Sequence, residues 1–356
     1  MFSLATLTDE QEMAMSAIAA FMADPRRQVF NLHGLAGTGK TTVLRHVAAQ
    51  YRHAVLCSLT GKAASVLRRR SGLQACTLHS FFYRLIEANK DKRGRDVLRF
   101  ERQHACGELH GNLVLLDESS MIGDEIGRDL LATGAKVIAC GDPGQLPPVK
   151  GQPFFRRADA TLVEIHRQAL ESSIVRQAHA VRSGGHYAAD GPCFRVGSDG
   201  TDDDLRDVDV VLCWTNRTKD YLNARCRRVR GYWQPMPQAG EPVVCLKNAP
   251  QYGIFNGATY TLLQPFLEAD TSIVLDVDGN AMEIPRVTFR SIPSALGADV
   301  EATTAFDFGY AMTVHKAQGS EWDSVVLVDE YRRYEQRKEW LYTGITRAAE
   351  RILIVR

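Results

Sequence analysis

Short apolar runs alternate with segments of helical spacing along most of the chain. The runs at residues 29–33, 113–116 and 136–140 are mostly apolar, which is typical of strands that are buried on both faces of a parallel sheet. Between such runs, apolar residues recur at helical spacing, as in residues 12–21. The alternation predicts a wound α/β domain in the first part of the chain.

A second α/β region is expected from residue 151 onward. Residues 170–181 have the apolar spacing of a half-buried helix, and residues 216–230 have the composition of a basic helix. Residues 199–209 contain six aspartates and one arginine, which predicts a solvated loop. Strands are expected in this region at residues 208–213, 325–328 and 352–355.

Two segments interrupt this alternation of strands and helices. Residues 82–111 are basic and contain a turn-like stretch, which fits a small hairpin or a helical insert. Residues 236–302 are rich in proline, glycine and short β-prone runs, which predicts a small β-barrel inserted into the second domain. The predicted fold class is therefore α/β, with two domains and two inserts. The first domain takes residues 1–81 and 112–150, and the second takes residues 151–235 and 303–356.

Length and hydropathy narrow the class of protein. The chain has 356 residues, of which 45% are hydrophobic, so two or three units of ordinary domain size are expected. No apolar run approaches the roughly 20 residues that are needed to span a bilayer, and the chain does not open with the basic region of a signal peptide. We therefore expect a cytoplasmic protein without a membrane partner.

Cysteine spacing and charge add two further expectations. The eight cysteines show no paired short spacing, which favours reduced thiols. A net charge of +1 argues against bulk electrostatic attraction to nucleic acid. Residues 62–102, however, carry eleven Lys and Arg against four Asp and Glu, so the chain has a local basic region.

Residues 34–42 have the composition of a phosphate-binding loop directly after the first apolar run. Glycines let the backbone amides turn toward an anion, and a helix that begins at Lys40 directs its positive end to the same place. Lys40 would reach the β- and γ-phosphates, and Thr41 would hold Mg²⁺. We therefore predict that the chain binds ATP with Mg²⁺. The residues that this loop assigns to the nucleotide are Gly34, Gly37, Thr38, Gly39, Lys40, Thr41 and Thr42.

Two later strand ends carry polar residues with matching chemistry. Asp117 and Glu118 end the run at residues 113–116, where the first could hold Mg²⁺ and the second could orient the attacking water. Gln145 follows the run at residues 136–140, and its amide could donate to a phosphate oxygen and accept from that water. These residues predict hydrolysis as well as binding.

The ordered set of motifs resembles a superfamily 1 helicase, specifically the 1B branch that includes RecD- and Dda-type enzymes. The matching segments span nearly the whole chain and lie at residues 34–42, 60–64, 77–81, 117–121, 141–148, 165–168, 310–321 and 341–348. The resemblance implies two RecA-like P-loop NTPase domains with ATP between them, a 1B insert at residues 82–111 and an SH3-like 2B barrel at residues 236–302. It also implies 5′ to 3′ movement on single-stranded DNA. Residues 58–59 are Ser-Leu where the family commonly has Ala-Pro.

The resemblance also implies individual roles around the nucleotide. Arg167 and Arg347 resemble arginine fingers, and Glu321 resembles the residue that binds the ribose. Gln11 resembles the residue that reads the adenine edge, although its spacing from Thr8 also fits a capping box at a helix start. Both interpretations of Gln11 stay open.

The resemblance further implies a DNA track and a wedge. Hydroxyl groups and cations suit a phosphodiester backbone. The insert at residues 82–111 resembles the part that presses on a duplex junction. The segments that face DNA in the family contain Thr60, Lys62, Thr77, His79, Ser80, Asn216, Thr313 and His315.

We therefore expect a monomeric helicase that acts on single-stranded DNA and duplex junctions, of bacterial or phage type. An RNA-directed helicase is a close rival, since nothing in the sequence reads the 2′-hydroxyl. A non-motor P-loop NTPase switch is a more distant one, because it leaves Gln145 and Arg167 without a role. A protein that uses ATP only as a structural ligand is a further alternative.

Overall fold

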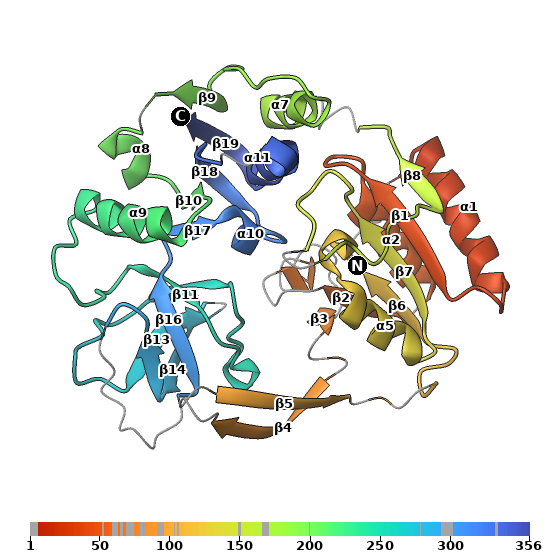
Figure 1. Ribbon diagram of the computed structural model, residues 1–356, viewed down its shortest axis with the longest axis horizontal. Coiled ribbons are helices and arrows are strands. Elements are labelled where there is room, and N and C mark those ends of the chain that lie inside the picture. The colour runs from red at the N-terminus through yellow and green to blue at the C-terminus, as the bar shows by residue number, and fades with distance from the viewer. Residues whose placement is uncertain are drawn as a thin grey trace. The chain divides into compact units, whose positions relative to one another are not determined.

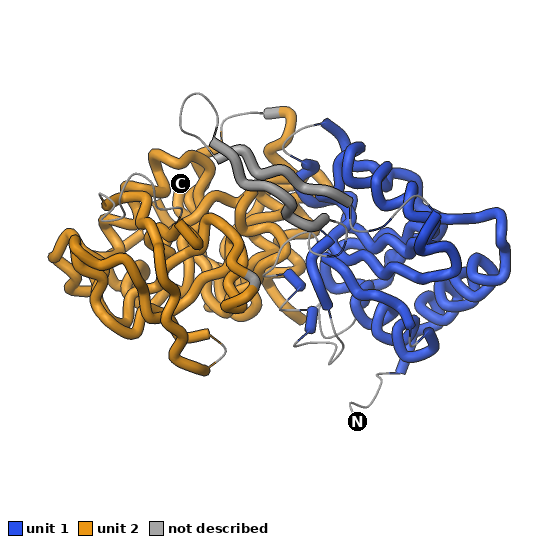
Figure 2. The backbone as a smooth tube through the Cα atoms, turned by 90° about the horizontal axis from the view of Figure 1, so that it is seen from below, with its two compact units in different colours: residues 1–170 blue, residues 171–356 orange. Residues whose placement is uncertain are grey.

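The structure is a computed structural model, and it divides the chain into two compact units, residues 1–170 and residues 171–356 (Figure 2). The described residues are 6–51, 53–58, 63–64, 67–68, 75–78, 81, 83–90, 96–102, 104, 107–148, 151–165, 171–198, 200–277, 279–292, 302–331 and 334–356.

Unit 1 is built on a six-stranded sheet in the order β3-β2-β6-β7-β1-β8, and every pairing in it is parallel (Figure 1). The near-continuous apolar runs therefore predicted the sheet type correctly. The strands are β1 (Val29–Gly34), β2 (Val55–Ser58), β3 (Ala75–Thr77), β6 (Leu113–Leu116), β7 (Lys136–Gly141) and β8 (Ala160–Leu162).

Helices cover both faces of this sheet. Ile138 and Cys140 of β7 pack in a core with α1 (Asp9–Ala23) and α2 (Lys40–Gln50). Val137 and Ala139 point to the opposite core, which includes Leu130 of α5 (Asp124–Ala132). Successive residues of a strand face opposite sides, so both faces need apolar side chains. A short 3-10 turn, η1 (Ser119–Met121), follows β6.

The first insert contains a hairpin. Strands β4 (Tyr83–Lys90) and β5 (Asp96–Arg102) pair antiparallel in a two-stranded sheet of their own. Of the two alternatives left open by the sequence, the described residues therefore favour the hairpin. Its tip at residues 91–95 lies outside the described residues.

Unit 2 contains a second parallel sheet, in the order β17-β10-β18-β19-β9. Its strands are β9 (Phe194–Gly197), β10 (Val210–Cys213), β17 (Ala311–Thr313), β18 (Trp322–Val328) and β19 (Ala348–Val355). Its helices are α7 (Ser173–Arg182), α8 (Asp202–Arg206), α9 (Asn216–Val229), α10 (Val314–Ala317) and α11 (Arg337–Ile345), with the 3-10 turn η3 (Tyr334–Gln336). The predicted basic helix at residues 216–230 is α9.

A six-stranded sheet combines five strands of the second insert with β16 (Thr304–Phe308), which follows the insert, and it shares a core with the parallel sheet of unit 2. All its pairings are antiparallel except the one between β15 and β16. Val211 of the parallel sheet and Phe306 of this sheet belong to the same hydrophobic cluster. The order is β14-β13-β12-β11-β16-β15, with β11 (Pro242–Cys245), η2 (Pro250–Tyr252), β12 (Thr259–Leu262), β13 (Ser272–Val277), β14 (Asn280–Pro285), β15 (Val287–Phe289) and β16 (Thr304–Phe308).

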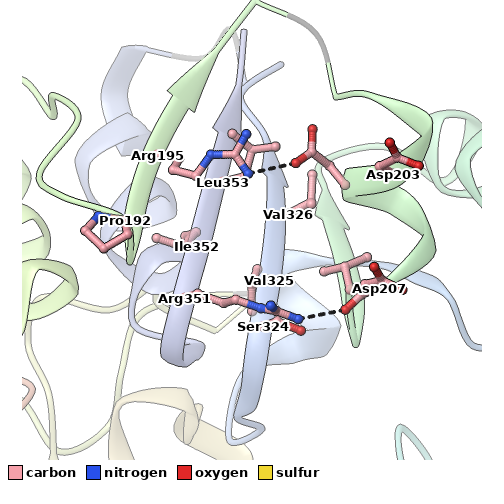
Figure 3. A pocket seen from close by; sticks show the side chains of 12 residues that line it. Pro192, Arg195, Asp203, Asp207, Ser324, Val325, Val326, Arg351, Ile352 and Leu353 are labelled. Carbon is pink, nitrogen blue, oxygen red and sulfur yellow. Dashed lines mark hydrogen bonds and ion pairs between the residues drawn. The ribbon is translucent and has the colours of Figure 1, made fainter.

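The charge of residues 199–209 predicted a solvated loop, but the structure shows that this stretch is not simply a loop. It contains the short helix α8, which Thr201 and Asp204 cap reciprocally, and Leu205 is buried. Acidic residues in a first helical turn interact favourably with the helix dipole. Figure 3 shows the neighbouring pocket of about 350 Å³, beside which Arg195 of β9 pairs with Asp204 at 2.8 Å.

Candidate functional site

The loop between β1 and α2 has a backbone that requires glycine. Gly37 and Gly39 have φ angles of 83° and 81°, a region that L side chains rarely adopt. A Cβ on Gly34 would lie 2.5 Å from Oγ1 of Thr38. The loop then enters α2, whose N-cap Gly39 provides no side-chain cap, so the first amides of α2 point toward the loop without a capping side chain.

Lys40 is held over this loop by backbone carbonyls. Its Nζ donates hydrogen bonds to the carbonyl oxygens of Gly34 (2.7 Å) and Leu35 (3.0 Å). The ammonium also lies 4.0 Å from the carboxylate of Asp142, which is 1% exposed. Thr41 and Thr42 occupy the first turn of α2 and are half-buried. The loop and helix thus bring a cation, hydroxyl groups and backbone amides together.

The acidic strand end carries backbone strain. Glu118 follows β6 with φ 57° and ψ 41°, in the left-handed region. Such a conformation costs a non-glycine residue of order 1–3 kcal/mol, and residues of this kind cluster at functional sites. The backbone N–H of Glu118 donates to Oδ1 of Asp117 at 3.0 Å. Both side chains are half-buried, so a ligand can reach them.

Gln145 is a buried side chain with an unused acceptor. It is 7% exposed, and its Oε1 accepts no hydrogen bond from the described residues. The hydroxyl groups of Ser119 and Ser120, next to the acidic strand end, are also buried and form no hydrogen bond with the described residues. Leaving such groups unpaired costs about 1–3 kcal/mol each. A polar ligand such as a hydrated Mg²⁺ with phosphate oxygens would satisfy them, so these residues fit the predicted cofactors.

The sheet order explains why these parts meet. Strands β6, β7 and β1 are parallel neighbours, so their carboxyl ends lie at one edge of the sheet, where open α/β sheets bind ligands. A cavity of about 190 Å³ opens at this edge and is lined by His33, Ser119 and Asp142, among others. Burial lowers the pKa of His33, which favours its neutral form there.

Gln11 has the capping role that its spacing predicted. Its Oε1 accepts from the backbone N–H of Thr8 (3.1 Å), and Thr8 caps α1 in return. The Nε2 of Gln11 donates to the carbonyl of Thr38 at 3.3 Å, and the side chain is 1% exposed. Gln11 therefore braces the phosphate-binding loop, and its contact with adenine stays a prediction.

Two further residues with predicted nucleotide roles, Arg347 and Glu321, belong to unit 2. Arg347 is 6% exposed, and its guanidinium donates to the carbonyls of Thr343 and Ser320, both at 3.1 Å. Glu321 is half-buried in the turn before β18. Arg167 lies outside the described residues. The finger and ribose roles of these residues stay predictions.

Three of the predicted DNA residues come together at the carboxyl edge of the unit 2 sheet. Strands β10 and β17 are parallel neighbours. Asn216 begins α9 after β10, and it is exposed. Thr313 ends β17 and caps α10, which contains His315. Burial lowers the pKa of His315. Of the remaining residues, Thr77 ends β3 in unit 1, and Thr60, Lys62, His79 and Ser80 lie outside the described residues.

Sequence reasoning missed two carboxylates near these sites. Asp142 lies inside the motif at residues 141–148, so its position was a usable signal, and it neighbours Lys40. Glu330 gave no local signal. Its carboxylate accepts from the backbone amides of Trp214 (2.8 Å) and Thr215 (3.0 Å) and thereby holds the turn that precedes Asn216.

Unit 1 is a P-loop nucleotide-binding domain, because its glycine loop leads into a helix at the carboxyl edge of a parallel sheet. Comparison with known proteins narrows that class. A family model described as an AAA domain matches residues 6–191, more than half of the chain, and one described as a UvrD-like helicase C-terminal domain matches residues 308–355.

Individual relatives agree with these matches. The ATP-dependent RecD2 DNA helicase of Deinococcus radiodurans is 29% identical over 97% of this chain and 48% of its own length. The RecBCD enzyme subunit RecD of Mycolicibacterium smegmatis is 27% identical over 91% of this chain and 67% of its own length. Among solved structures, a Bacteroides Pif1 helicase in complex with ADP-AlF3 and single-stranded DNA is 20% identical, with a TM-score of 0.63 over 98% of this chain and 92% of that chain.

The chain therefore belongs to the AAA-domain family, and it is similar to RecD-type helicases of superfamily 1B. This confirms the resemblance that the motifs predicted. The Pif1 structure shares the α/β fold with parallel sheets. The chain spans about half the length of the RecD2 relative. In the described part of the chain, no helix has the length and apolar character to cross a membrane.

Proposed function

We propose that the chain is a DNA motor that hydrolyses Mg-ATP, moves 5′ to 3′ along single-stranded DNA and unwinds duplex DNA. The observation that carries this proposal is the carboxyl edge of the unit 1 sheet, where Lys40, the strained Glu118 and the buried Gln145 follow neighbouring strands. Such an edge suits hydrolysis of a triphosphate, and the likeness to the ATP-dependent RecD2 DNA helicase supports its coupling to DNA.

The proposed chemistry assigns one task to each residue of that edge. Thr41 and Asp117 would provide oxygen ligands for a Mg²⁺ ion, which would supply positive charge to the phosphates of the nucleotide. Lys40 exchanges its two backbone carbonyl partners for phosphate oxygens. Glu118 orients the attacking water, and the unpaired Oε1 of Gln145 accepts a hydrogen bond from that water while its amide N–H group faces the γ-phosphate.

Further residues complete the nucleotide site. Arg167 and Arg347 supply positive charge to the γ-phosphate in the transition state, a role worth about 10³ to 10⁵ in rate for an arginine finger. Glu321 binds the ribose. Gln11 contacts the adenine edge while it braces the loop through Thr38.

The proposed DNA track uses hydroxyl, amide and imidazole groups against the phosphodiester backbone. In unit 2, Asn216, Thr313 and His315 lie at the ends of neighbouring strands, which supports a shared role. The hydroxyl of Thr313 accepts from the backbone of Lys316, so its own proton can be donated to a phosphate. Thr60, Lys62, Thr77, His79 and Ser80 are the proposed contacts from residues 1–81.

Two accessory roles complete the proposal. The hairpin β4–β5 is the 1B wedge that the second strand of a duplex meets. The antiparallel sheet of unit 2 corresponds to the SH3-like 2B barrel of the family. The protein acts as a monomer in the cytoplasm, in a bacterial or phage-type context.

The test compares phosphate release and strand separation on four substrates, which are 5′-tailed and 3′-tailed duplexes in DNA and in RNA. We expect phosphate release that single-stranded DNA stimulates, and unwinding of the 5′-tailed DNA duplex. Phosphate release without stimulation would instead identify a non-motor NTPase, and no phosphate release at all would leave ATP as a structural ligand. A preference for the RNA substrates would identify an RNA helicase.

A further inference from the structure

One exposed face of α9 carries arginine and tyrosine side chains, which are absent from the set of proposed DNA residues. Arg217, Tyr221, Ala224 and Arg228 recur at intervals of four, three and four residues, and all four are exposed. Residues three and four apart lie on one face of a helix, so these four form a single stripe, here called the α9 stripe. The opposite face contains the buried Leu222 and Cys226 and packs on the core of unit 2.

The side chains of the α9 stripe are available to a ligand. Tyr221 is 59% exposed, so its ring is open to contact from solvent. Arg217 and Arg228 form no ion pair or side-chain hydrogen bond with any described residue. Arg225 and Arg227 of the same helix differ, because Arg225 pairs with a carboxylate at 3.0 Å and Arg227 pairs with one at 2.6 Å. Helix α9 thus has two structural arginines and two unengaged ones.

The α9 stripe begins next to the predicted DNA track. Arg217 follows Asn216 directly, at the carboxyl edge of the sheet. From Arg217 to Arg228 the helix rises about 16 Å, at 1.5 Å per residue. That length equals about five nucleotides at the stacked spacing of 3.4 Å and fewer in an extended strand. Trp233, which is 74% exposed, lies just beyond the end of α9.

We propose that the α9 stripe is a second contact surface for single-stranded DNA, which continues the track from Asn216. The two guanidinium groups suit phosphates, and the ring of Tyr221 between them suits an unstacked base. A partner with only carboxylates, such as an acidic peptide, would engage the arginines but would leave the ring without a base to stack on. The proposal rests on the proposed function, because it extends the same DNA track.

The test measures the affinity of the intact protein for oligo-dT of increasing length, from about 6 to about 20 nucleotides, by fluorescence anisotropy. The affinity of the wild type should rise with oligonucleotide length by more than the larger number of binding positions on a longer strand accounts for. Tyr221→Ala should lose about 5- to 150-fold of the affinity for long oligonucleotides, which is the range expected for one base stacked on one ring. It should bind short oligonucleotides as the wild type does, and Tyr221→Phe should match the wild type at every length.

The charged ends of the stripe have a separate readout. Replacing both Arg217 and Arg228 by alanine should reduce the slope of log affinity against log salt by about 1.4, or about 0.7 for each phosphate contact. Arg128→Ala is the matched control, since it removes an exposed arginine from α5 and should leave the slope unchanged.

Three outcomes would overturn the proposal. The first is equal affinity of Tyr221→Ala and the wild type for long oligonucleotides. The second is an unchanged salt slope in the double arginine variant. The third is an acidic peptide that binds to the stripe and that single-stranded DNA does not displace. If short oligonucleotides still stimulate ATP hydrolysis in any of these cases, only the stripe fails and the proposed function stands.

Discussion

The hydroxyl of Thr218 donates a 2.6 Å hydrogen bond to Oε2 of Glu330, although 112 positions separate the two residues in the sequence. The other oxygen, Oε1, accepts from the backbone amides of Trp214 and Thr215. One carboxylate therefore joins the segment after β18 to the first turn of α9. Because Asn216 lies in that turn, Glu330 is a positioning residue for the proposed DNA track.

Replacing Glu330 should weaken DNA binding more than nucleotide binding. Glu330→Ala leaves three donors without their acceptor, at about 1–3 kcal/mol each where the group is buried, so the turn should lose its fixed position. Glu330→Gln keeps one acceptor oxygen and should have an intermediate effect. Titrations with single-stranded DNA and with an ATP analogue would measure both affinities. An equal loss of both, together with a lower melting temperature, would show that Glu330 serves only the fold.

Lys40→Ala should abolish ATP turnover while the protein stays folded. Among the described residues, the ammonium donates to two loop carbonyls and lies 4.0 Å from the carboxylate of Asp142, so its loss leaves the hydrophobic core unchanged. Phosphate release and circular dichroism would measure activity and folding. Lys338→Ala, an exposed lysine of α11, is the matched control and should keep full activity. Turnover in the Lys40 variant would contradict the site assignment.

Arg347→Ala should reduce the rate of hydrolysis by about 10³ or more and keep nucleotide binding within a few fold. The same change removes hydrogen bonds to Thr343 and Ser320, so a loss of stability of about 1–3 kcal/mol is also expected. Arg351→Ala is a control, because it removes a guanidinium that also donates to a backbone carbonyl. Single-turnover kinetics and thermal unfolding would separate the two effects. A change in nucleotide affinity alone would mark Arg347 as a ground-state contact.

Cys76 should react with alkylating agents at a lower pH than the buried thiols. Its sulfur lies 3.6 Å from that of Cys57, and the hydrogen bond from Cys57 lowers the pKa of Cys76 although burial opposes the shift. Burial raises the pKa of Cys226 to about 11 and that of Cys213 to about 12. A lowered pKa means more thiolate at a given pH, so labelling of Cys76 should begin before that of Cys213 and Cys226 as the pH rises.

Mass spectrometry of peptides labelled at a series of pH values would measure that order. Cys57→Ala removes the hydrogen-bond donor, so the pH midpoint for labelling Cys76 should rise in this variant. An unchanged midpoint would show that the neighbouring thiol does not set the pKa of Cys76.

Replacing residues 91–100 by a short Gly-Ser linker should separate translocation from unwinding. The hairpin contains none of the nucleotide motifs, so DNA-stimulated ATP hydrolysis should stay largely intact. Duplex opening must overcome stacking of about 1.4 kcal/mol per step and also needs a rigid obstacle for the second strand. Strand-separation assays should therefore show a severe loss. A parallel loss of both activities would place the hairpin in the motor or the fold, and no loss would place the wedge elsewhere.

The sequence predicted those features that depend on nearby residues. The phosphate-binding loop was recognisable because its glycines, Lys40 and the preceding apolar run are contiguous. The parallel sheets were recognisable because a strand buried on both faces must be apolar at successive positions. Gln11 shows the limit of this reasoning, since its capping bond to Thr8 is local and its bond to Thr38 joins residues 27 positions apart.

Other features depend on partners that are distant in sequence. The charge count at residues 199–209 suggested solvation, but Asp204 caps α8 and pairs with Arg195 of β9, while Leu205 is buried beside it. The strained backbone of Glu118 could not be foreseen, because nothing in an Asp-Glu pair specifies a left-handed conformation. Glu330 was missed because its three hydrogen-bond partners precede it by more than one hundred positions.

The shared core of unit 2 limits what can be engineered there. Lys219 of α9 pairs at 2.7 Å with Asp307 of β16, and both side chains are buried, while residues of both sheets fill one hydrophobic cluster. Truncating one partner of a buried ion pair typically costs about 3–5 kcal/mol. The six-stranded sheet of unit 2 therefore cannot be removed on its own, because its excision would expose the hydrophobic core that it shares with the parallel sheet. Calorimetry of the protein should show one cooperative melting transition for unit 2.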